Sequence, residues 1–383
     1  MSANGSQSPV SVVIIGGGSI AQTHAKCLIQ SPSTTLVAII DPFETGLNLA
    51  RSLSIPHFSS LAEFLASDKD VSIDIYMVCT PSGLHVPVAQ EVLNATNPKL
   101  ILVEKPISTD IESGEQLLRL AAEKGCQVAV GHHRRFHPAI ATAKETLASG
   151  AVGNLTAISG LWTCKKNDEY FKQAPWRSSR KTGGGPIWTN LVHDLDALQY
   201  LVGSCIVRLW ATPTPKRRHH PDVKEEDSVE EGAAVMLQFG NGTVGTMVIC
   251  DNVPSPYSWE AATGENVGIV KAEAPVDSWR FFGSQGTLSV PDGYLWTYDE
   301  QGLAKQGVEP GWGTPLTRKQ LSAKDESPFD IQVEHMARVV RSGERPICSG
   351  SDGLAAVRAC QAIIDALDNP SRGPVEVGNG AEL

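Results

Sequence analysis

Short apolar runs alternate with helix-like segments over the first 130 residues of the chain. Each run is apolar at nearly every position, which is typical of strands buried on both faces, as in a parallel sheet. Strand–helix alternation of this kind predicts a doubly wound α/β domain. The predicted strands cover residues 10–15, 34–40, 73–78, 99–103 and 126–130.

The clearest helical pattern in this part of the chain spans residues 110–125. Thr109 followed by Glu112 can form a capping box at its start. Gly125 stands where a helix C-cap glycine belongs.

The pattern changes after about residue 150, where apolar and polar positions begin to alternate. Asn-Gly at 241–242 and Asp-Gly at 292–293 mark tight turns, so we expect an antiparallel sheet. Segments 230–251 and 278–299 carry apolar residues on both faces, and such a surface is usually covered, so we expect a homodimer or homotetramer. The strand-like segments are 155–164, 230–240, 242–251, 278–290 and 294–299, and the helical ones are 190–203, 330–343 and 351–368.

These patterns divide the chain into a tail at 1–9, a first domain at 10–131 and a second domain at 132–383. The tail is polar, so we expect it to be disordered, and it lacks the basic and apolar regions of a signal peptide. The predicted helix 351–368 could pack back on the first domain.

Composition narrows the range of partners. Hydrophobic residues make up 41% of the chain and charged residues 19%, as in ordinary globular proteins. A net charge of −10 argues against a nucleic-acid partner, and the basic segment 216–220 runs directly into an acidic one. No apolar stretch approaches the roughly 20 residues of a membrane span, so we expect no membrane partner.

Eight cysteines are scattered along the chain without a CxxC motif or a paired metal spacing. Several stand inside apolar runs, as small buried side chains do. We therefore expect reduced thiols, a cytoplasmic location and no metal site.

Three glycines end the first predicted strand, in the sequence VVIIGGGSIAQTHA at residues 12–25. In the pattern G-x-G-x-x-A, Gly16 permits a tight turn and Gly18 lets a pyrophosphate reach the helix N-terminus. Ala21 allows close packing of helix on strand. A plain strand-to-helix turn is the alternative. The residues expected to bind a dinucleotide here are Gly16, Gly18, Ser19 and Ile20.

An acidic residue at the end of the second strand strengthens this interpretation. Asp41 lies 20 residues beyond Ala21, where a carboxylate can accept hydrogen bonds from the ribose hydroxyls. Its charge also repels a 2′-phosphate, and no arginine follows it in the sequence DPFE. NAD is therefore the expected cofactor, in preference to NADP.

Two further strand ends face the same expected crevice, because ligands of open α/β sheets lie beyond the carboxyl ends of the strands. The third run ends in CTPSGLH at 79–85 and the fourth in VEKPIS at 103–108. Lys105 could contact a ligand there or only cap a surface loop, and His85 could cover the cofactor or only begin the next helix. The residues expected to contact the cofactor at these ends are Thr80, Pro81, His85, Glu104 and Lys105.

The chain resembles the Gfo/Idh/MocA family of NAD(P)-dependent oxidoreductases, named for glucose–fructose oxidoreductase and inositol dehydrogenase. The resemblance runs from about residue 10 to 368. It implies a Rossmann domain followed by an α/β domain with a large, open, mostly antiparallel sheet, through which family members commonly associate. It rests on GGGSIAQTH (16–24), CTPSGLH (79–85), EKPIS (104–108), GHHRRFHP (131–138) and GGGPIWTNLVHDLD (183–196).

The resemblance also implies a catalytic set. The lysine of the EKP motif is Lys105, and the active-site histidine is His193. Family enzymes often carry an aspartate four residues before that histidine, where this chain has Thr189 followed by Asn190. On a helix, Asn190 and Asp196 lie three residues to either side of His193, so Asn190 could bind substrate and Asp196 could orient the imidazole. A structural salt bridge is the alternative for Asp196.

These residue types suit alcohol oxidation, in which a hydride moves to the nicotinamide and a base takes the hydroxyl proton. Histidine, with an ordinary pKa of about 6.5, exchanges protons near neutral pH. A positioned lysine could bind or relay the same proton. Other residues could contact a polyol substrate, although packing in the core is the commoner role of aromatic side chains: Arg134, Trp162, Tyr170, Trp176 and Arg177.

Three classes of function are compatible with this chain. The first is a dehydrogenase or reductase acting on a sugar, an inositol or a related cyclic polyol. The second is a redox-assisted glycosidase or lyase that keeps NAD tightly bound and regenerates it. The third is a non-enzymatic NAD-binding sensor or regulator, which has no need of the pair Lys105 and His193. That pair favours an enzyme, and the fold alone does not decide among the three.

Overall fold

The computed structural model describes residues 8–67, 72–218, 223–266, 268–369 and 373–378, which form two compact units. The first unit consists of Met1–Phe136 and Glu326–Val357, and the second of His137–Asp325 and Arg358–Leu383. Most of the predicted tail 1–9, and part of the basic segment 216–220, lie outside the described residues.

The first unit is built on a six-stranded parallel sheet with the order β3-β2-β1-β4-β5-β6. Five of these strands coincide with predicted apolar runs, while β3 has only two residues and no apolar run announces it. The strands are β1 (Val10–Ile15), β2 (Thr34–Ile40), β3 (His57–Phe58), β4 (Ile75–Val78), β5 (Leu100–Val103) and β6 (Gln127–Val130).

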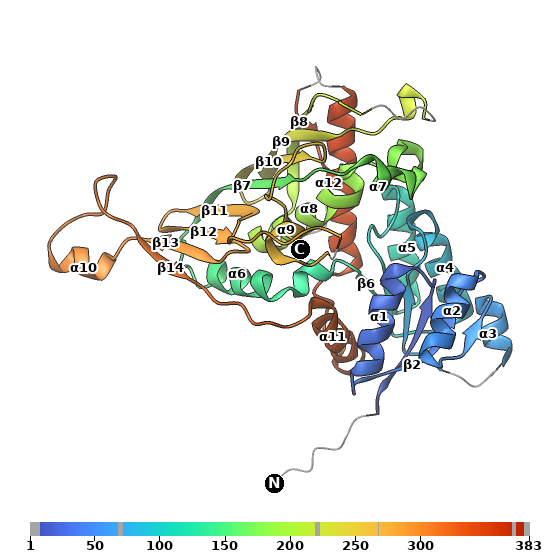
Figure 1. Ribbon diagram of the computed structural model, residues 1–383. Helices are drawn as coiled ribbons and strands as arrows, with labels where there is room; N and C mark the ends of the chain where they lie inside the picture. Colours follow the sequence, from blue (N-terminus) through green and yellow to red (C-terminus); the bar gives the residue numbers. More distant parts are fainter. Residues whose placement is uncertain (1–7, 68–71, 219–222, 267, 370–372, 379–383) are drawn as a thin grey trace, which may run out of the picture. The chain divides into compact units, whose positions relative to one another are not determined.

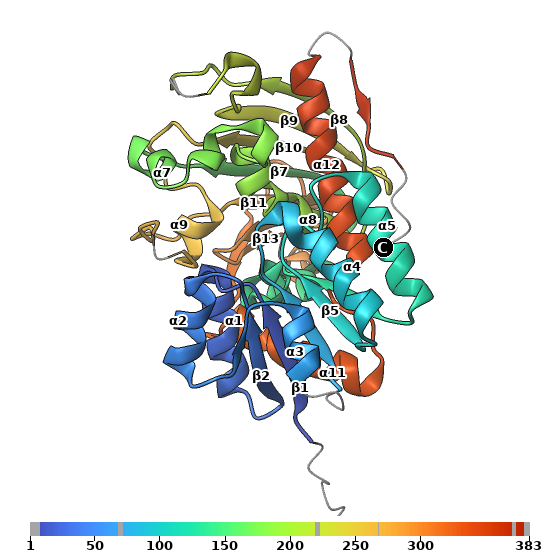
Figure 2. The ribbon, with the colours of Figure 1, turned by 90° about the vertical axis from the view of Figure 1, so that its right-hand side faces the viewer.

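Helices cover both faces of this sheet, with α1 and α2 on one face and α4 and α5 on the other (Figure 1, Figure 2). The N-cap of α5 is Asp110, whose side chain accepts a hydrogen bond from Ser113 N at 2.8 Å; the predicted capping box at Thr109 is therefore wrong by one residue. The helices are α1 (Ser19–Gln30), α2 (Glu44–Leu53), α3 (Leu61–Ser67), α4 (His85–Ala95) and α5 (Ile111–Glu123).

A helix from late in the chain, α11 (Pro328–Ser342), also belongs to the first unit. Its apolar face, with Val333 and Met336 buried, joins the core formed by β1, β2, β4 and β5. The predicted division at residue 131 placed this helix in the second domain. The structure differs there because the helix buries its apolar side against the parallel sheet.

The second unit contains a nine-stranded sheet with the order β14-β13-β12-β11-β7-β10-β9-β8-β15. Its neighbouring strands are antiparallel except β7 and β10, which are parallel. The two sheets confirm the predicted α/β class. The strands are β7 (Leu155–Thr163), β8 (Ile206–Pro213), β9 (Gly232–Phe239), β10 (Val244–Cys250), β11 (Trp279–Gly283), β12 (Gly286–Val290), β13 (Tyr294–Thr297), β14 (Thr317–Gln320) and β15 (Val375–Glu376).

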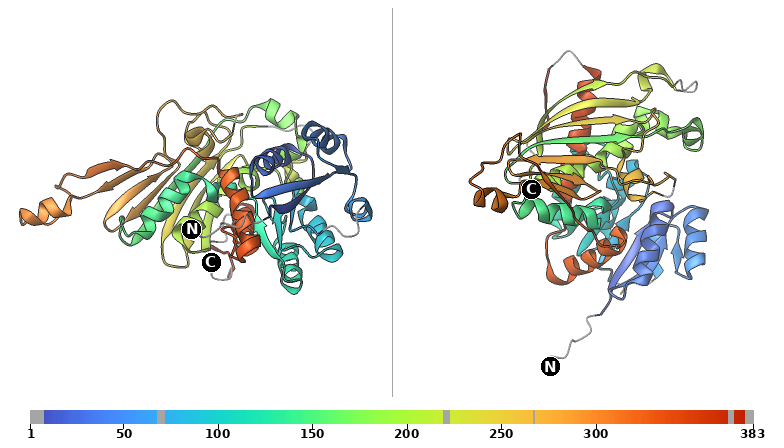
Figure 3. Two further views of the ribbon diagram at one scale, coloured as in Figure 1. Left: turned by 90° about the horizontal axis from the view of Figure 1, so that it is seen from below. Right: turned by 60° about the vertical axis from the view of Figure 1, so that its left-hand side comes forward.

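Helices α6 (Pro138–Ala148) and α8 (Val192–Val202) pack together in the second unit, and α6 also contacts β12. The interior includes the fully buried side chains of Trp162, Trp259 and Trp279, and the last two stack with ring centroids 4.9 Å apart. Shorter helices are α7 (Asp168–Lys172), α9 (Trp259–Thr263) and α10 (Glu300–Lys305), the last beyond the ends of β13 and β14 (Figure 3). The long helix α12 (Gly350–Asp368) runs across the division between the units.

One face of the nine-stranded sheet carries exposed apolar side chains. Along β9 and β10, buried and exposed residues alternate, so the exposed residues share one face. Residues directly opposite each other on neighbouring strands point to the same face. Met236 lies opposite Trp210, and Thr287 lies opposite both Phe282 and Trp296. The exposed apolar residues on this sheet are Trp210, Met236, Val244, Val248, Phe282 and Trp296.

Candidate functional site

The turn between β1 and α1 requires glycine at its first position. Gly16 has a φ of +104°, and a Cβ atom there would lie 2.5 Å from the carbonyl oxygen of Cys79. Gly17 is equally restricted, because a Cβ atom would lie 2.3 Å from the Cα atom of Gly46. The chain therefore turns tightly here and brings its backbone to the carboxyl ends of the neighbouring strands.

Gly18, by contrast, borders open space. A Cβ atom at Gly18 would meet nothing within 4 Å, and Gly18 and Ser19 are exposed while Ile20 is half-buried. Gly18 is the N-cap of α1, and no side chain caps that end. The first N–H groups of a helix lack intrahelical partners and favour anions. The arrangement therefore fits the pyrophosphate of a dinucleotide.

Asp41 holds this turn as well as ending β2. Its Oδ2 accepts a hydrogen bond from Gly17 N at 2.5 Å, and its Oδ1 accepts one from Phe43 N at 2.7 Å. The side chain is 6% exposed, and each oxygen keeps a second lone pair with which it can accept from a ribose hydroxyl. The residues that follow, 42–45, lead into α2, are exposed and carry no cation. These features fit NAD.

The loops after β4 and β5 are joined by His85. This residue begins α4 and is 1% exposed, with Nδ1 2.7 Å from the carbonyl oxygen of Pro106 and Nε2 2.8 Å from that of Thr80. Burial lowers the pKa of His85, although both carbonyl groups oppose that shift. Its side chain therefore links the two loops from inside, while Thr80 is half-buried and Pro81 is exposed.

Glu104 points into the first unit, where it pairs with a residue that sequence reasoning did not select. Its Oε1 lies 2.7 Å from Nε2 of His24, and both side chains are almost fully buried. A Cβ atom at Gly131 would lie 2.5 Å from Oε1 of Glu104, so glycine is needed there. Burial opposes ionisation of this carboxyl group, yet the hydrogen bond from His24 and neighbouring positive charges lower its pKa. The one sequence feature that could have pointed to His24 is its position on the first predicted helix.

Lys105 follows directly and is half-buried, and its backbone N–H donates to Oε2 of Glu104 at 3.2 Å. The pair of His24 and Glu104 therefore anchors the loop that carries the predicted catalytic lysine.

The histidines and arginines between His132 and Arg135, after β6, pack into the first unit. His133 stacks on Phe329 with ring centroids 4.5 Å apart, and Arg135 donates to the carbonyl oxygen of Ile347 at 2.7 Å. Arg134, the predicted substrate contact in this group, is 1% exposed and so presents almost no surface to a ligand. The tight packing of this turn, His133–Phe136, explains the difference.

In the second unit, a π-helical turn at Ile187–Leu191 runs directly into α8. Such turns are rare in proteins, and those that occur are often found at functional sites. Asn190 lies in this turn and is half-buried, and His193 lies in the first turn of α8 and is 6% exposed. Asp196 is fully buried. The hydroxyl of Thr189 lies 2.8 Å from both the carbonyl oxygen of Gly185 and Oδ1 of Asn190, to one of which it can donate.

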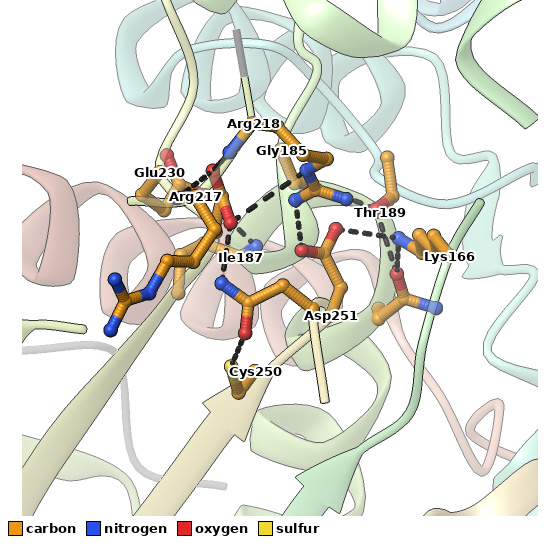
Figure 4. Close-up of polar contacts among 12 residues, drawn as sticks. Lys166, Gly185, Ile187, Thr189, Arg217, Arg218, Glu230, Cys250 and Asp251 are labelled. Carbon is orange, nitrogen blue, oxygen red and sulfur yellow. Dashed lines mark hydrogen bonds and ion pairs between the residues drawn. The ribbon is translucent and has the colours of Figure 1, made fainter. Parts of the chain in front are cut away.

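A buried polar cluster adjoins this turn (Figure 4). Lys166 donates to Oδ1 of Asn190 at 2.7 Å and lies 3.6 Å from Asp251. Asp251 in turn pairs closely with Arg218, whose backbone N–H donates to Glu231 at 2.5 Å. Burial raises the pKa of Asp251, although Lys166 and Arg218 oppose that shift. The sequence analysis did not select Lys166. The one feature that could have pointed to it is its place between a predicted strand and an aromatic segment.

The predicted aromatic contacts separate into two groups. Trp162 is fully buried: its indole N–H donates to Glu260 at 2.8 Å, and the Lys166 ammonium covers its ring. It is therefore a core residue in this structure, and its expected stacking on substrate is corrected. Tyr170 and Arg177 lie together, with the guanidinium 3.9 Å from the ring centroid, and Trp176 beside them is 47% exposed.

Glu230 is buried behind the glycine segment 183–185. Its Oε1 accepts from Ile187 N at 3.2 Å, and a Cβ atom at Gly185 would lie 2.5 Å from that oxygen. Burial raises the pKa of Glu230 to about 7. The side chain thus borders the backbone that leads to Asn190, and no sequence pattern pointed to it.

The described residues contain neither a metal-binding cluster nor a helix suited to span a membrane. No group of three or more histidine, cysteine, aspartate or glutamate side chains among them could hold a metal ion. No helix in the described part of the chain is both long and apolar enough to cross a membrane.

Two family models match the chain. The first, described as an oxidoreductase family with an NAD-binding Rossmann fold, covers residues 10–132. The second, described as the GFO/IDH/MocA C-terminal domain, covers residues 140–289.

Known proteins are similar along nearly the whole chain. Inositol 2-dehydrogenase of Rhizobium meliloti (strain 1021) is 23% identical over 355 residues, or 92% of this chain and 96% of that protein. The scyllo-inositol 2-dehydrogenase (NAD(+)) of Bacillus subtilis (strain 168) is 25% identical over 366 residues, 94% of each chain.

Among solved structures, an oxidoreductase from Agrobacterium radiobacter in complex with NAD+, L-tartaric acid and magnesium has a TM-score of 0.74 at 16% identity. The match covers 96% of this chain and 98% of that one, and at this identity it shows a shared fold. The two family models confirm the resemblance seen in the sequence motifs. The chain belongs to the Gfo/Idh/MocA family of oxidoreductases, and its first unit is the family's NAD-binding Rossmann fold.

Proposed function

We propose that this protein is an NAD-dependent dehydrogenase that moves a hydride between nicotinamide and a CH–OH carbon of a sugar, an inositol or a related cyclic polyol. The observation that carries the proposal is Asp41, a buried carboxylate that holds the glycine turn and has no cation in the loop after it. That arrangement favours ribose hydroxyls over a 2′-phosphate. The inositol dehydrogenases among the relatives support the substrate class.

In the proposed reaction, the substrate hydroxyl loses its proton while the carbon loses a hydride, and a carbonyl group forms. NAD+, when bound at the glycine turn, would supply the acceptor for that hydride. His193 takes the proton, because a histidine titrates near neutral pH and this one lies in the turn beside Asn190. Asn190 binds a neighbouring hydroxyl. Lys105, on the loop anchored by Glu104, holds the oxygen that becomes the carbonyl and shares the proton.

Turnover of NAD+ by purified protein tests the proposal. NADH formation is measured against a panel of inositols, sugars and sugar acids. General acid–base groups contribute on the order of 10²- to 10⁴-fold, so Lys105→Ala and His193→Ala should each lower kcat at least about 100-fold. Because the two side chains take part in the same proton transfer, the double variant should lose less activity than the product of the two single losses. Lys124→Ala, at an exposed lysine of the first unit, is the control.

The same panel separates the alternatives. Substrate consumed without net NADH would point to a redox-assisted glycosidase or lyase. If Lys105→Ala and His193→Ala bind NAD and turn over the substrate at the wild-type rate, these two residues are not the catalytic pair. NAD binding without any reaction would favour a sensor. Asn190→Ala should cost at least about tenfold in kcat/KM through a lost hydrogen bond to the substrate.

We further propose that the protein is a homodimer or homotetramer in the cytoplasm. The exposed apolar face of the nine-stranded sheet supports association, because large apolar faces of this kind are usually covered. The eight cysteines, all in the described part of the chain and none of them in a disulfide, support a reducing compartment.

A further inference from the structure

Lys166 is a largely buried cation in the second unit that the proposed chemistry does not use. It lies three residues after β7, and its backbone N–H donates to the carbonyl oxygen of Asp251 at 2.9 Å. Its side chain is 11% exposed. A charged amine is costly to remove from water unless partners replace its hydration. What surrounds the ammonium therefore indicates what it is placed to do.

The ammonium is held by neutral groups as well as by the carboxylate of Asp251, 3.6 Å away. It donates to the side-chain oxygen of Asn190 at 2.7 Å, and it lies 4.9 Å from the ring centroid of Tyr170 and 5.3 Å from that of Trp162. Asn190 is the residue proposed to bind a substrate hydroxyl. The positive charge of Lys166 is therefore held one side chain away from the proposed reacting group.

The nearby carboxylates are shared with other groups: Oδ2 of Asp251 faces Lys166, while its Oδ1 contacts Arg218. Asp251 lies 3.6 Å from Lys166 but contacts Arg218 more closely, and Arg218 also pairs with Glu231 (Figure 4). Glu260 accepts the indole N–H of Trp162. Lys166 therefore shares the negative charge of Asp251 with Arg218.

A second cation lies on the same aromatic ring. The guanidinium of Arg177 is 3.9 Å from the ring centroid of Tyr170 and donates to that residue's carbonyl oxygen at 2.7 Å. Within the described residues, no carboxylate lies within ion-pair distance of Arg177. Lys166 and Arg177 thus leave positive charge beside Tyr170, where a mobile anion would gain more than a neutral group.

We infer that Lys166, assisted by Arg177, binds a carboxylate on the substrate, so that the preferred substrates are acidic sugars or acidic cyclic polyols. A singly charged group suits the site because Asp251 already compensates part of the Lys166 charge. The inference rests on the proposed function, since Asn190 and His193 mark the substrate side of this unit. It assigns Lys166 to substrate selection, with proton transfer left to Lys105 and His193.

Calorimetric binding to the complex with NADH tests the inference without turnover. Glucuronate, galacturonate and mannuronate are compared with glucose, galactose and mannose. Glucose 6-phosphate tests whether a phosphate group binds in place of the carboxylate. At least one acid should bind ten or more times tighter than its neutral counterpart and tighter than the phosphate. Lys166→Met should reduce that preference to below threefold, and Lys166→Arg should keep most of it. Lys165→Met, at the adjacent exposed lysine, should leave it unchanged.

Several results would overturn the inference: equal affinity or no binding for every pair, tighter binding of the phosphate, or a preference that survives in Lys166→Met. The wild-type comparison needs no variant, so a misfolded variant does not block the test. Acid binding that depends on Lys166 without NADH formation from any acid would leave the inference standing and remove the dehydrogenase function. Oxidation of neutral polyols, with no binding or reaction of any acid, would leave the dehydrogenase function standing and remove the inference about Lys166.

Discussion

Asp41 shows how one side chain serves both the fold and the site. Its two oxygens accept backbone N–H groups from either side of β2, from Gly17 in the glycine turn and from Phe43 in the loop that follows. The same carboxylate carries the charge that distinguishes two nicotinamide cofactors. Structural and selective roles are therefore coupled in this residue, and substitutions should affect both.

Asp41→Asn should weaken NAD binding at least about tenfold, or 1.4 kcal/mol, and change NADP binding much less. The amide cannot accept two backbone hydrogen bonds and a ribose hydroxyl as a carboxylate can, whereas its neutrality removes the repulsion of a 2′-phosphate. Calorimetric titration with both cofactors measures the change, with Glu44→Gln, an exposed acid at the start of α2, as the control. Wild-type protein with equal affinity for the two cofactors would contradict this assignment.

Adjacent glutamates in the second unit have opposite pKa shifts. Burial raises the pKa of Glu230 from 4.5 to about 7, a shift that Arg180 opposes and Asp251 supports. Burial also acts on Glu231, but the backbone N–H of Arg218 and the amide of Asn252 outweigh it and lower that pKa. The folded protein therefore favours the protonated form of one carboxyl group and the ionised form of the next.

Because the pKa of Glu230 is higher in the folded than in the unfolded chain, this group should lower the free energy of unfolding as pH rises from about 4.5 to 7. Glu230→Gln should therefore stabilise the protein at pH 8 by about 3.5 kcal/mol, because the pKa is shifted by about 2.5 units at about 1.4 kcal/mol per unit, and should change little near pH 4. Glu231→Gln should destabilise it at pH 8. Urea unfolding at both pH values measures this, and destabilisation by Glu230→Gln at pH 8 would refute it.

At the scale of elements, the turn from β1 to α1 combines two glycines with different requirements. Gly16 needs its positive φ and has no room for a Cβ atom, whereas Gly18 has ordinary backbone angles and open space above it. The first glycine serves the fold and the second leaves a surface for a ligand. Exchanging each for alanine separates the two roles.

Gly16→Ala should lower the free energy of unfolding by about 2 kcal/mol or more, through backbone strain and the clash with Cys79. Gly18→Ala should leave stability within about 0.5 kcal/mol and weaken NAD binding at least tenfold, because the added methyl group occupies the space for the pyrophosphate. Denaturant unfolding and calorimetry with NAD give the two readouts. Normal NAD affinity in Gly18→Ala would show that the pyrophosphate does not bind at this turn.

At the scale of the whole molecule, the exposed face of the nine-stranded sheet predicts self-association. Met236→Glu or Val248→Glu should convert a dimer or tetramer to monomers, because a charge is costly in an apolar interface. Light scattering at micromolar concentration measures the mass, and Val270→Glu, at an exposed loop position, is the control. Wild-type protein that is monomeric under these conditions would rule out the proposed assembly.

The sequence by itself determined the elements that depend on local pattern. Continuous apolar runs specified five of the six parallel strands, and the glycine motif located the dinucleotide turn. The run at 278–290 was predicted as one segment but contains two strands, β11 and β12, joined by a short turn. Strands β8 and β14 were not predicted; β14 is exposed at all four positions, so no burial periodicity announced it.

Tertiary structure decided the contacts between residues far apart in sequence. His24 and Glu104 are 80 residues apart, and only the packing of α1 against the strand ends brings them to 2.7 Å. Lys166 meets Asn190 for the same kind of reason, and α11 joins the first unit because its apolar face fits that core. Periodicity and turn chemistry act over a few residues and are written locally. Burial, pairing and pKa shifts arise when separate elements exclude water together, so they are decided only in the folded chain.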